Sequence, residues 1–312
     1  MSSIVVSIVI PVHNEAEVLP SLFKRLLPVM ASLNTTYEII LVNDGSTDNS
    51  AAILDDYQRR DPEHIRIIHF NGNFGQHMAI MAGFEHVRGE TTITLDADLQ
   101  NPPEEIPNLL AVAHKGHDVV GGYRMDRQDS AWRLCVSKWH NKLREKIAPS
   151  LNMKDEGCML RAYHRNVINA MVSTKELSTF IPALAMTYAH NPAEIGVKHE
   201  ARTEGTSSYN LYKLIRYNFD LITNFSLVPL QIFTLIGMVV SFLSTLFVIY
   251  LFVRRLMIGP EAEGLFTLFA ILFLLIGIVL MGLGIVGEYI GRIYQQVQGR
   301  PRFIIQRMVG FK

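Results

Sequence analysis

Two carboxylates stand directly behind an apolar run near the middle of the sequence. The run Thr91–Leu95 is rich in β-branched residues, and Asp96 and Asp98 follow it at a spacing of two, before Pro102 and Pro103. Such a run is typical of a buried strand, and open α/β folds bind ligands at the carboxyl ends of their strands. Two hard oxygen donors at that edge suit Mg²⁺ or Mn²⁺ carrying a diphosphate. A solvated turn is the alternative interpretation, since Asp is a common turn residue.

Short apolar runs alternate with helical patterns over the first part of the chain. This alternation predicts an α/β fold with a mostly parallel sheet covered by helices. We expect strands at Val5–Ile10, Glu38–Asn43, Ile65–Phe70, Thr91–Leu95 and Asp118–Gly121, and helices near 16–32, 47–60, 76–87 and 103–115.

Four of the expected strands end in polar residues. These are Pro11–Glu15, Asn43–Ser46, Asn71–Asn73 and Asp96–Asp98. Because they converge on one edge of the sheet, they predict a nucleotide-sized site. The sequence has no Gly-x-Gly-x-x-Gly and no Gly-x-x-x-x-Gly-Lys-[Ser/Thr], which disfavours a dinucleotide-dependent dehydrogenase and a P-loop protein.

Composition narrows the class of protein further. Lys plus Arg and Asp plus Glu both number 29, so no overall charge argues for a nucleic-acid partner. The two cysteines, Cys135 and Cys158, are far apart, which argues against a disulfide framework or a zinc site and fits a reducing compartment. The apolar run Ile4–Ile10 is too short for a signal peptide and is typical of a first strand.

Two long uncharged runs lie toward the C-terminus. Leu227–Val253 and Leu265–Gly287 each exceed the roughly 20 residues that cross a bilayer, although buried core helices are the alternative. The connector between them holds two basic residues and the tail after them holds five, which places the tail and the N-terminal domain in the cytoplasm.

The segment before the first span has leucines and aromatic residues at helical spacing. It predicts an interfacial amphipathic helix, with an ordinary surface helix as the alternative. The expected organisation is a cytoplasmic domain over 1–208, the interfacial helix over 209–226, two spans over 227–287 with a short periplasmic loop near 254–264, and a cytoplasmic tail over 288–312.

Three motifs in order resemble a known family. Val9–Glu15, Val42–Asp48 and Leu95–Asp98 are similar to the opening strand, the second strand end and the metal motif of family 2 glycosyltransferases with the GT-A fold. The two spans and Gly287–Tyr294 narrow the resemblance to polyisoprenyl-phosphate glycosyltransferases. Finer matches are Asn73–His77, Asp98–Pro107, Arg127–Ser130 and Gly157–Tyr163.

The resemblance implies a reaction at the bacterial inner membrane. The donor would be UDP-linked 4-deoxy-4-formamido-L-arabinose and the acceptor undecaprenyl phosphate, in inverting, metal-dependent transfer that serves lipid A modification and polymyxin resistance. Another UDP-sugar, such as glucose, and a non-catalytic nucleotide-binding membrane module stay open. A processive synthase would need Gln-x-x-Arg-Trp and more spans, and neither is present. Tails of relatives pair between subunits, which implies a homotetramer, while a disordered basic tail is the alternative.

The donor site is assigned from the same resemblance. Asp44 would accept from the uracil N3–H, and Asp98 would be the first metal ligand with Asp96 assisting. Gln100 would position the sugar. Some residues of this site also have an alternative role. Glu15 could interact with a helix dipole, Asp44 could form an Asx-turn, and Asn73 and Gln76 could cap a helix. The residues assigned to nucleotide binding are Pro11, Glu15, Asp44, Asn73, Gln76, Asp96 and Ala97.

The acceptor needs cations more than a base. A lipid phosphate is largely dianionic at neutral pH, so the protein must hold it in line with the anomeric carbon. Arginines suit that task, although attraction to anionic lipids is their alternative role. The candidates are Arg124, Arg127, Arg133, Arg161 and Arg202, and Arg127 is also assigned to catalysis.

One further acid precedes a cysteine. Asp155 is a candidate base or orienting group by the resemblance, although Cys158 stands where many relatives have Asp. A thiol nucleophile at Cys158 is disfavoured because no nearby motif would activate it. The segment Arg202–Tyr209 resembles a mobile loop that closes over the site, with Ser208 in place of the usual Lys.

Overall fold

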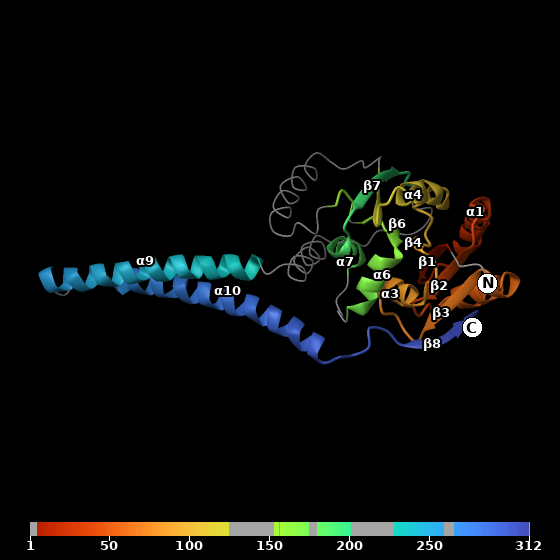
Figure 1. The fold of residues 1–312 in the computed structure, drawn as a ribbon. Coiled ribbons are helices and arrows are strands. Elements are labelled where there is room, and N and C mark those ends of the chain that lie inside the picture. The colour runs from red at the N-terminus through yellow and green to blue at the C-terminus, as the bar shows by residue number, and fades with distance from the viewer. Residues whose placement is uncertain are drawn as a thin grey trace. The chain divides into compact units, whose positions relative to one another are not determined.

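The structure is a computed structural model that describes residues 5–124, 153–155, 157–174, 180–200, 228–258 and 265–311. The chain divides into two compact units. The first is Met1–Tyr209 together with Pro301–Lys312, and the second is Asn210–Arg300. The first unit is built on a β-sheet and the second contains two long helices (Figure 1).

The sheet of the first unit has eight strands in the order β7-β5-β6-β4-β1-β2-β3-β8. The four strands β4, β1, β2 and β3 run parallel at its centre. Antiparallel β6 joins β4 to β5, and antiparallel β8 pairs with β3. The strands are β1 Val6–Val12, β2 Tyr37–Asn43, β3 Ile65–Phe70, β4 Thr91–Thr94, β5 Val119–Arg124, β6 Arg161–His164, β7 Pro192–Val197 and β8 Ile305–Val309.

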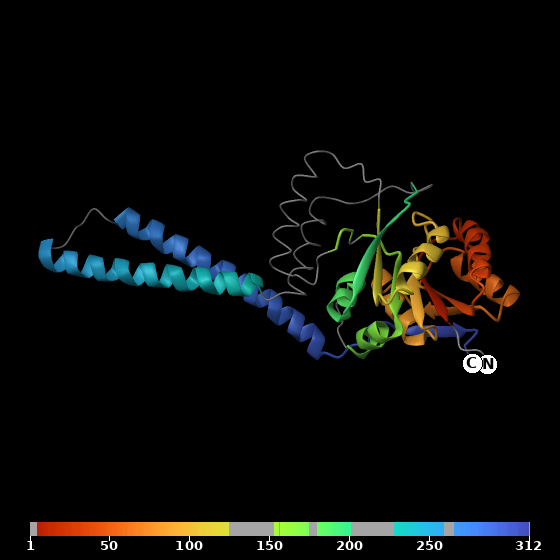
Figure 2. The same ribbon diagram turned by 45° about the horizontal axis from the view of Figure 1, so that its top comes forward.

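Helices cover both faces of this sheet (Figure 2). One face packs against α1, α2 and α4, and the other against α3, α6 and α7. All seven residues of β1 are buried, because a parallel strand between two helical layers has no solvent side, and this explains the unbroken apolar runs of the sequence. The helices are α1 Leu19–Ser32, α2 Ser50–Arg60, α3 Gln76–His86, α4 Ile106–Ala113, α6 Arg165–Ser173 and α7 Ile181–Tyr188.

The GT-A-type α/β fold expected from the sequence is confirmed. All five predicted strands are present within a few residues of their expected bounds. The helix expected over 103–115 is a short 3-10 turn, Pro103–Glu105, followed by α4. Strands β6, β7 and β8 were not predicted.

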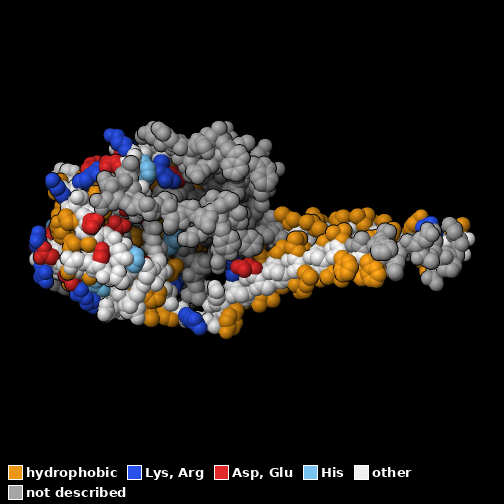
Figure 3. Space-filling view, turned by 180° about the vertical axis from the view of Figure 1, so that it is seen from behind, with side chains coloured by type: hydrophobic (Ala, Val, Ile, Leu, Met, Phe, Trp, Pro, Cys, Tyr) orange, Lys and Arg blue, Asp and Glu red, His pale blue; other side chains and the backbone are white. Residues whose placement is uncertain are grey.

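The second unit contains α9 Val228–Ile258 and α10 Leu265–Val297. Both are long and apolar enough to cross a membrane, and hydrophobic side chains line their surfaces (Figure 3). Helix α10 continues past the expected end of the apolar run, and within this extension Glu288 and Arg292 pair at 2.6 Å, one helical turn apart. The predicted interfacial helix over 209–226 lies outside the described residues.

Candidate active site

A polar cavity of about 440 Å³ lies at the carboxyl edge of the central strands. Its walls come from the segments after β1, β2, β3 and β4, as the converging strand ends predicted. It brings together all the residues that the sequence analysis assigned to binding the nucleotide, the metal and the sugar. The lining residues are Pro11, Val12, His13, Glu15, Asp44, Asn73, Gly75, Gln76, Asp96, Ala97, Asp98 and Gln100.

Asp44 ties two walls of the cavity together. Its Oδ1 accepts the Phe74 N–H at 2.7 Å and its Oδ2 accepts the Gly75 N–H at 2.9 Å. The following Gly45 has a φ of 63°, and a Cβ there would lie 2.3 Å from the carbonyl carbon of Gly72. The side chain of Asp44 therefore fixes the loop after β3 and makes no Asx-turn of its own in these bonds. The turn after β2 is closed by Asn43, whose Oδ1 accepts the Ser46 N–H at 3.0 Å.

His13 is a cavity residue to which sequence reasoning gave no role. Its Nδ1 lies 2.8 Å from the Asp44 carbonyl oxygen, and its Nε2 lies 3.0 Å from Nδ2 of Asn73. Because an amide nitrogen only donates, Nε2 accepts and Nδ1 carries the proton that is donated to Asp44. The signal was its place between Pro11 and Glu15, both of which were singled out.

The alternative roles of the neighbouring residues are partly resolved. Glu15 lies at the turn that leads into α1, since its carbonyl oxygen accepts the Leu19 N–H at 3.0 Å, so the helix-dipole role stays open beside the predicted one. Asn73 accepts the Gly75 N–H at 3.1 Å, and the N-cap residue of α3, Gly75, makes no side-chain cap. Asn73 therefore braces its own loop while it also reaches His13.

The two carboxylates behind β4 are held in different ways. Oδ1 of Asp96 accepts from Nε2 of Gln76 at 2.5 Å, which joins the start of α3 to the acidic motif. Oδ1 of Asp98 accepts the Gln100 N–H at 3.1 Å, across Leu99 with its φ of 61°. Within the described residues no group of three or more His, Cys, Asp or Glu side chains could hold a metal. The predicted metal ligands Asp96 and Asp98 both line the cavity, and carboxylate oxygens are hard ligands of the kind Mg²⁺ and Mn²⁺ prefer.

Asp155 is engaged in a bidentate ion pair. Arg124 donates from Nε to Oδ2 at 2.6 Å and from Nη2 to Oδ1 at 2.8 Å, and the Arg124 and Gly157 backbone N–H groups also reach this carboxylate. The Asp155 side chain is only 4% exposed. A carboxylate with this many donors is a poor proton acceptor, because each bond stabilises its charged form. The arrangement supports an orienting role over a general base.

Arg161 does not fit the predicted contact with the acceptor phosphate. It is 1% exposed on β6, and its guanidinium donates to the carbonyl oxygens of Cys158 at 2.9 Å and Asp155 at 2.6 Å. Arg124 keeps a quarter of its side chain exposed but is paired with Asp155. The remaining candidates Arg127, Arg133 and Arg202 lie outside the described residues.

Cys158 is an inert core residue. Burial raises the pKa of its thiol to about 11, and its Sγ donates to Oδ1 of Asn101 at 3.5 Å. A protonated, buried thiol is a poor nucleophile, in agreement with the expectation from the sequence.

The sequence did not predict the contacts that hold the chain segment after β7. Arg25 on α1 donates to both Glu104 and Glu200, and the Glu200 N–H donates to the Gln100 carbonyl at 2.9 Å. The chain leaving β7 is therefore fixed beside Gln100 just before Arg202. Surface Arg and Glu residues at these distant positions carry no local signal of their pairing.

Comparison with known proteins identifies the family to which the chain belongs. The profile of glycosyl transferase family 2 matches residues 7–171. The chain is 49% identical over 306 residues to an undecaprenyl-phosphate 4-deoxy-4-formamido-L-arabinose transferase of Klebsiella pneumoniae, covering 97% of this chain and 93% of the relative. It is 50% identical over 307 residues to the transferase of the same name from Yersinia enterocolitica, covering 98% and 94%.

Among solved structures, a glucosyl-3-phosphoglycerate synthase from Mycobacterium tuberculosis in complex with Mn²⁺, UDP and phosphoglyceric acid aligns with a TM-score of 0.49 at 14% identity, over 70% of this chain and 78% of that one. With matches to the family profile over more than half its length and to relatives over nearly all of it, the chain belongs to glycosyl transferase family 2.

Proposed function

We propose that the protein transfers 4-deoxy-4-formamido-L-arabinose from UDP to undecaprenyl phosphate at the bacterial inner membrane. The observation that carries this proposal is the polar cavity with Asp44 at one wall and Asp96 and Asp98 at another, in a chain whose relatives bear that activity in their names. Its volume of about 440 Å³ lies within the usual range of small-molecule sites.

The uracil would lie against Asp44. Two backbone N–H groups already bind its carboxylate, but a carboxylate offers about four lone-pair positions, so it can also accept the single N3–H of uracil. Pro11 and Glu15 would border the uracil and the ribose. Asn73 and Gln76 would contact the nucleotide from the loop after β3, and Asp96 and Ala97 would flank the ribose and the diphosphate.

The acidic motif would hold a divalent cation, Mg²⁺ or Mn²⁺. Asp98 is the leading ligand, since Oδ2 of this residue accepts no hydrogen bond from any described residue, and Asp96 would assist directly or through water. A bound cation would neutralise charge on the leaving UDP. Gln100, fixed to Asp98 through its backbone, would position the sugar.

The nucleophile would be the phosphate of the lipid. Because that group is largely dianionic at neutral pH, the protein must orient it rather than deprotonate it. Arg124, which Asp155 holds in an ion pair, would orient this phosphate, and Arg127, Arg133 and Arg202 are the proposed direct contacts.

Helices α9 and α10 would cross the membrane, with the connector in the periplasm. Strand β8, which follows α10, pairs with β3 of the sheet, and this supports the tail and the catalytic domain lying on the same, cytoplasmic side. A homotetramer is proposed as well, because the resemblance of the tail to the tails of relatives implies it.

The test is a transfer assay on the purified full-length protein. It is incubated with undecaprenyl phosphate, Mg²⁺ or Mn²⁺ and a panel of UDP-sugars, with and without EDTA. We expect transfer of the formamido-arabinose sugar only, abolished by EDTA and by Asp98→Ala. A matched control is Asp56→Ala, which removes an exposed acid of α2 paired with Arg60. Comparable transfer of glucose would contradict the sugar assignment, and full activity in EDTA would contradict the metal site.

A further inference from the structure

We propose that the C-terminal segment 303–307 positions the nucleotide-binding loops, with Arg307 and Phe303 as positioning residues for donor binding. The inference rests on the proposed function, because it requires the cavity to hold UDP. Neither residue lines the cavity, so both would act through the groups that they contact.

The segment is fixed to the last central strand. In the β3–β8 ladder Arg307 lies opposite His69, and a register irregularity follows between His69 and Phe70. The Asn71 N–H donates to the Ile304 carbonyl at 3.1 Å, so the contact extends past the end of β3 into the loop that enters the cavity wall. The segment that follows the two long helices in the sequence, strand β8, thus forms the edge strand of the sheet next to β3.

A polar route runs from Arg307 to the residue before Asp44. The Arg307 guanidinium donates to Oδ2 of Asp55, and Oδ1 of Asp55 lies 3.0 Å from Nε2 of His69. Nδ1 of His69 lies 3.0 Å from Nδ2 of Asn43.

Only one placement of the protons satisfies the hydrogen bonds from Asp55 through His69 to Asn43. The carboxylate can only accept, so Nε2 of His69 donates, and Nδ1 then accepts from the Asn43 amide. Burial lowers the pKa of His69, which favours this neutral form. The Asn43 carbonyl group is thereby turned toward the Ser46 N–H, which it binds at 3.0 Å. Arg307 therefore sets the orientation of the side chain next to Asp44.

An aromatic route reaches Asp44 from the other side. Phe303 stacks on Phe70 with ring centres 5.0 Å apart and an interplanar angle of 11°, and Phe70 meets Phe74 edge-on at 5.6 Å. The Phe74 N–H donates to Oδ1 of Asp44. The polar route ends on Asn43, the chain neighbour of Asp44, and the aromatic route ends on the Phe74 N–H that the Asp44 carboxylate accepts. Loss of either route should therefore shift the Asp44 carboxylate, which would bind uracil, without removing it.

The experiment measures UDP affinity of the full-length protein in detergent by calorimetry, with Mn²⁺ present. We expect Arg307→Met and Phe303→Ala each to weaken UDP binding about tenfold, within the range of modulation by residues that do not touch the ligand. Arg307→Lys keeps a cation for Asp55 and should recover most of the affinity. Gln306→Ala alters an exposed neighbour on the same strand and should leave the affinity within about twofold of the wild type.

A double-mutant cycle separates positioning from general destabilisation. If Arg307 acts through its ion pair with Asp55, the effects of the two substitutions should not add. The double variant Arg307→Met/Asp55→Asn should then bind UDP as tightly as whichever single variant has the lower affinity. Unchanged UDP affinity in Arg307→Met and Phe303→Ala would overturn the inference. A loss of affinity that appears only together with a change in the oligomeric mass measured by light scattering would overturn it as well. Absence of UDP binding in the wild type would instead contradict the proposed function.

Discussion

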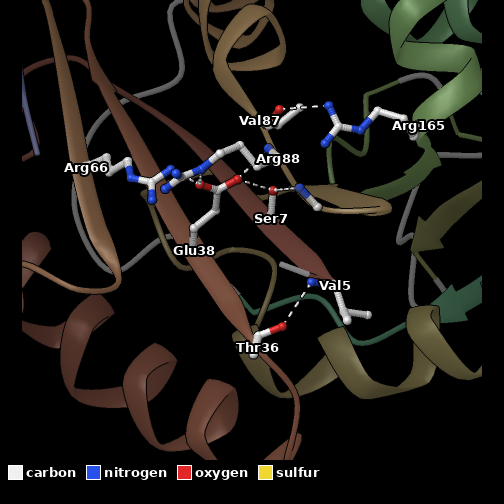
Figure 4. A network of polar contacts seen from close by, with 9 residues as sticks. Val5, Ser7, Thr36, Glu38, Arg66, Val87, Arg88 and Arg165 are labelled. Carbon is white, nitrogen blue, oxygen red and sulfur yellow. Dashed lines mark hydrogen bonds and ion pairs between the residues drawn. The ribbon is translucent and has the colours of Figure 1, made fainter. Parts of the chain in front are cut away.

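Glu38 and Arg66 form an ion pair that lies wholly inside the protein, between β2 and β3. Their side chains are 0% and 8% exposed. The Glu38 carboxylate also accepts from the Ser7 hydroxyl at 2.6 Å, from the Arg88 N–H at 2.6 Å and from Nε of Arg88 at 3.3 Å (Figure 4). Three strand or loop segments are thus joined through one buried acid, away from the residues that line the cavity.

This network predicts a large loss of stability on Glu38→Ala. The substitution leaves the Arg66 guanidinium buried without its partner and should cost about 3 kcal/mol, as loss of one member of a buried pair typically does. Thermal unfolding of the full-length protein in detergent measures the effect. Asp56→Ala, which removes an exposed partner of Arg60, serves as the control and should cost at most about 0.5 kcal/mol. Equal shifts in the two variants would contradict the buried-network interpretation.

A second prediction concerns the role of Asp155. If Asp155 orients Arg124, then Asp155→Asn should lower kcat about tenfold and leave the shape of the pH–rate profile unchanged, whereas loss of a general base costs about 10²–10⁴. The Arg124→Met variant should show a similar loss, and the double variant should be no slower than either. A profile that loses its acid limb in Asp155→Asn would restore the base assignment.

The central sheet and the cavity could be predicted because their signals are local. Four buried parallel strands produce continuous β-branched runs, and each ends in a polar cluster that the topology brings to one edge. Asp44 was assigned to the site from its motif, and it lines the cavity. Its bonds to Phe74 and Gly75 join residues 30 and 31 positions apart, and no local pattern in the sequence predicts them.

The errors arose where tertiary contacts override composition. Arg161 was expected to contact the acceptor phosphate because arginine suits that task, yet its side chain is buried and its guanidinium donates to the backbone carbonyls of Cys158 and Asp155. Strand β8 was missed because Gln306, Arg307 and Met308 are exposed at the edge of the sheet and lack an apolar pattern.

A third prediction follows from the buried thiol of Cys158. In a Cys135→Ser background, iodoacetamide should fail to label the folded protein and should label it after unfolding, as read by mass spectrometry. Burial raises the thiol pKa from 9.0 to about 11, so the folded state favours the protonated form. The stability from this group is therefore fully present below pH 9 and is lost as the pH rises toward 11. The unfolding midpoint of Cys158→Ala should fall less steeply over this interval, and an equally steep fall would contradict the shifted pKa.

The last prediction concerns the bond from Gln76 to Asp96. The amide donor at 2.5 Å holds one oxygen of Asp96 and adds no charge to the acidic motif. Gln76→Glu would replace that donor with a second carboxylate, and the repulsion should turn Asp96 away and weaken binding of UDP with Mn²⁺ about tenfold. Gln306→Glu makes the same chemical change at an exposed position of β8 and controls for net charge. If Gln76 only caps the start of α3, Gln76→Glu should bind UDP as the wild type does, because an acid at a helix N-terminus is favourable; weaker binding confined to Gln76→Glu therefore separates the two roles.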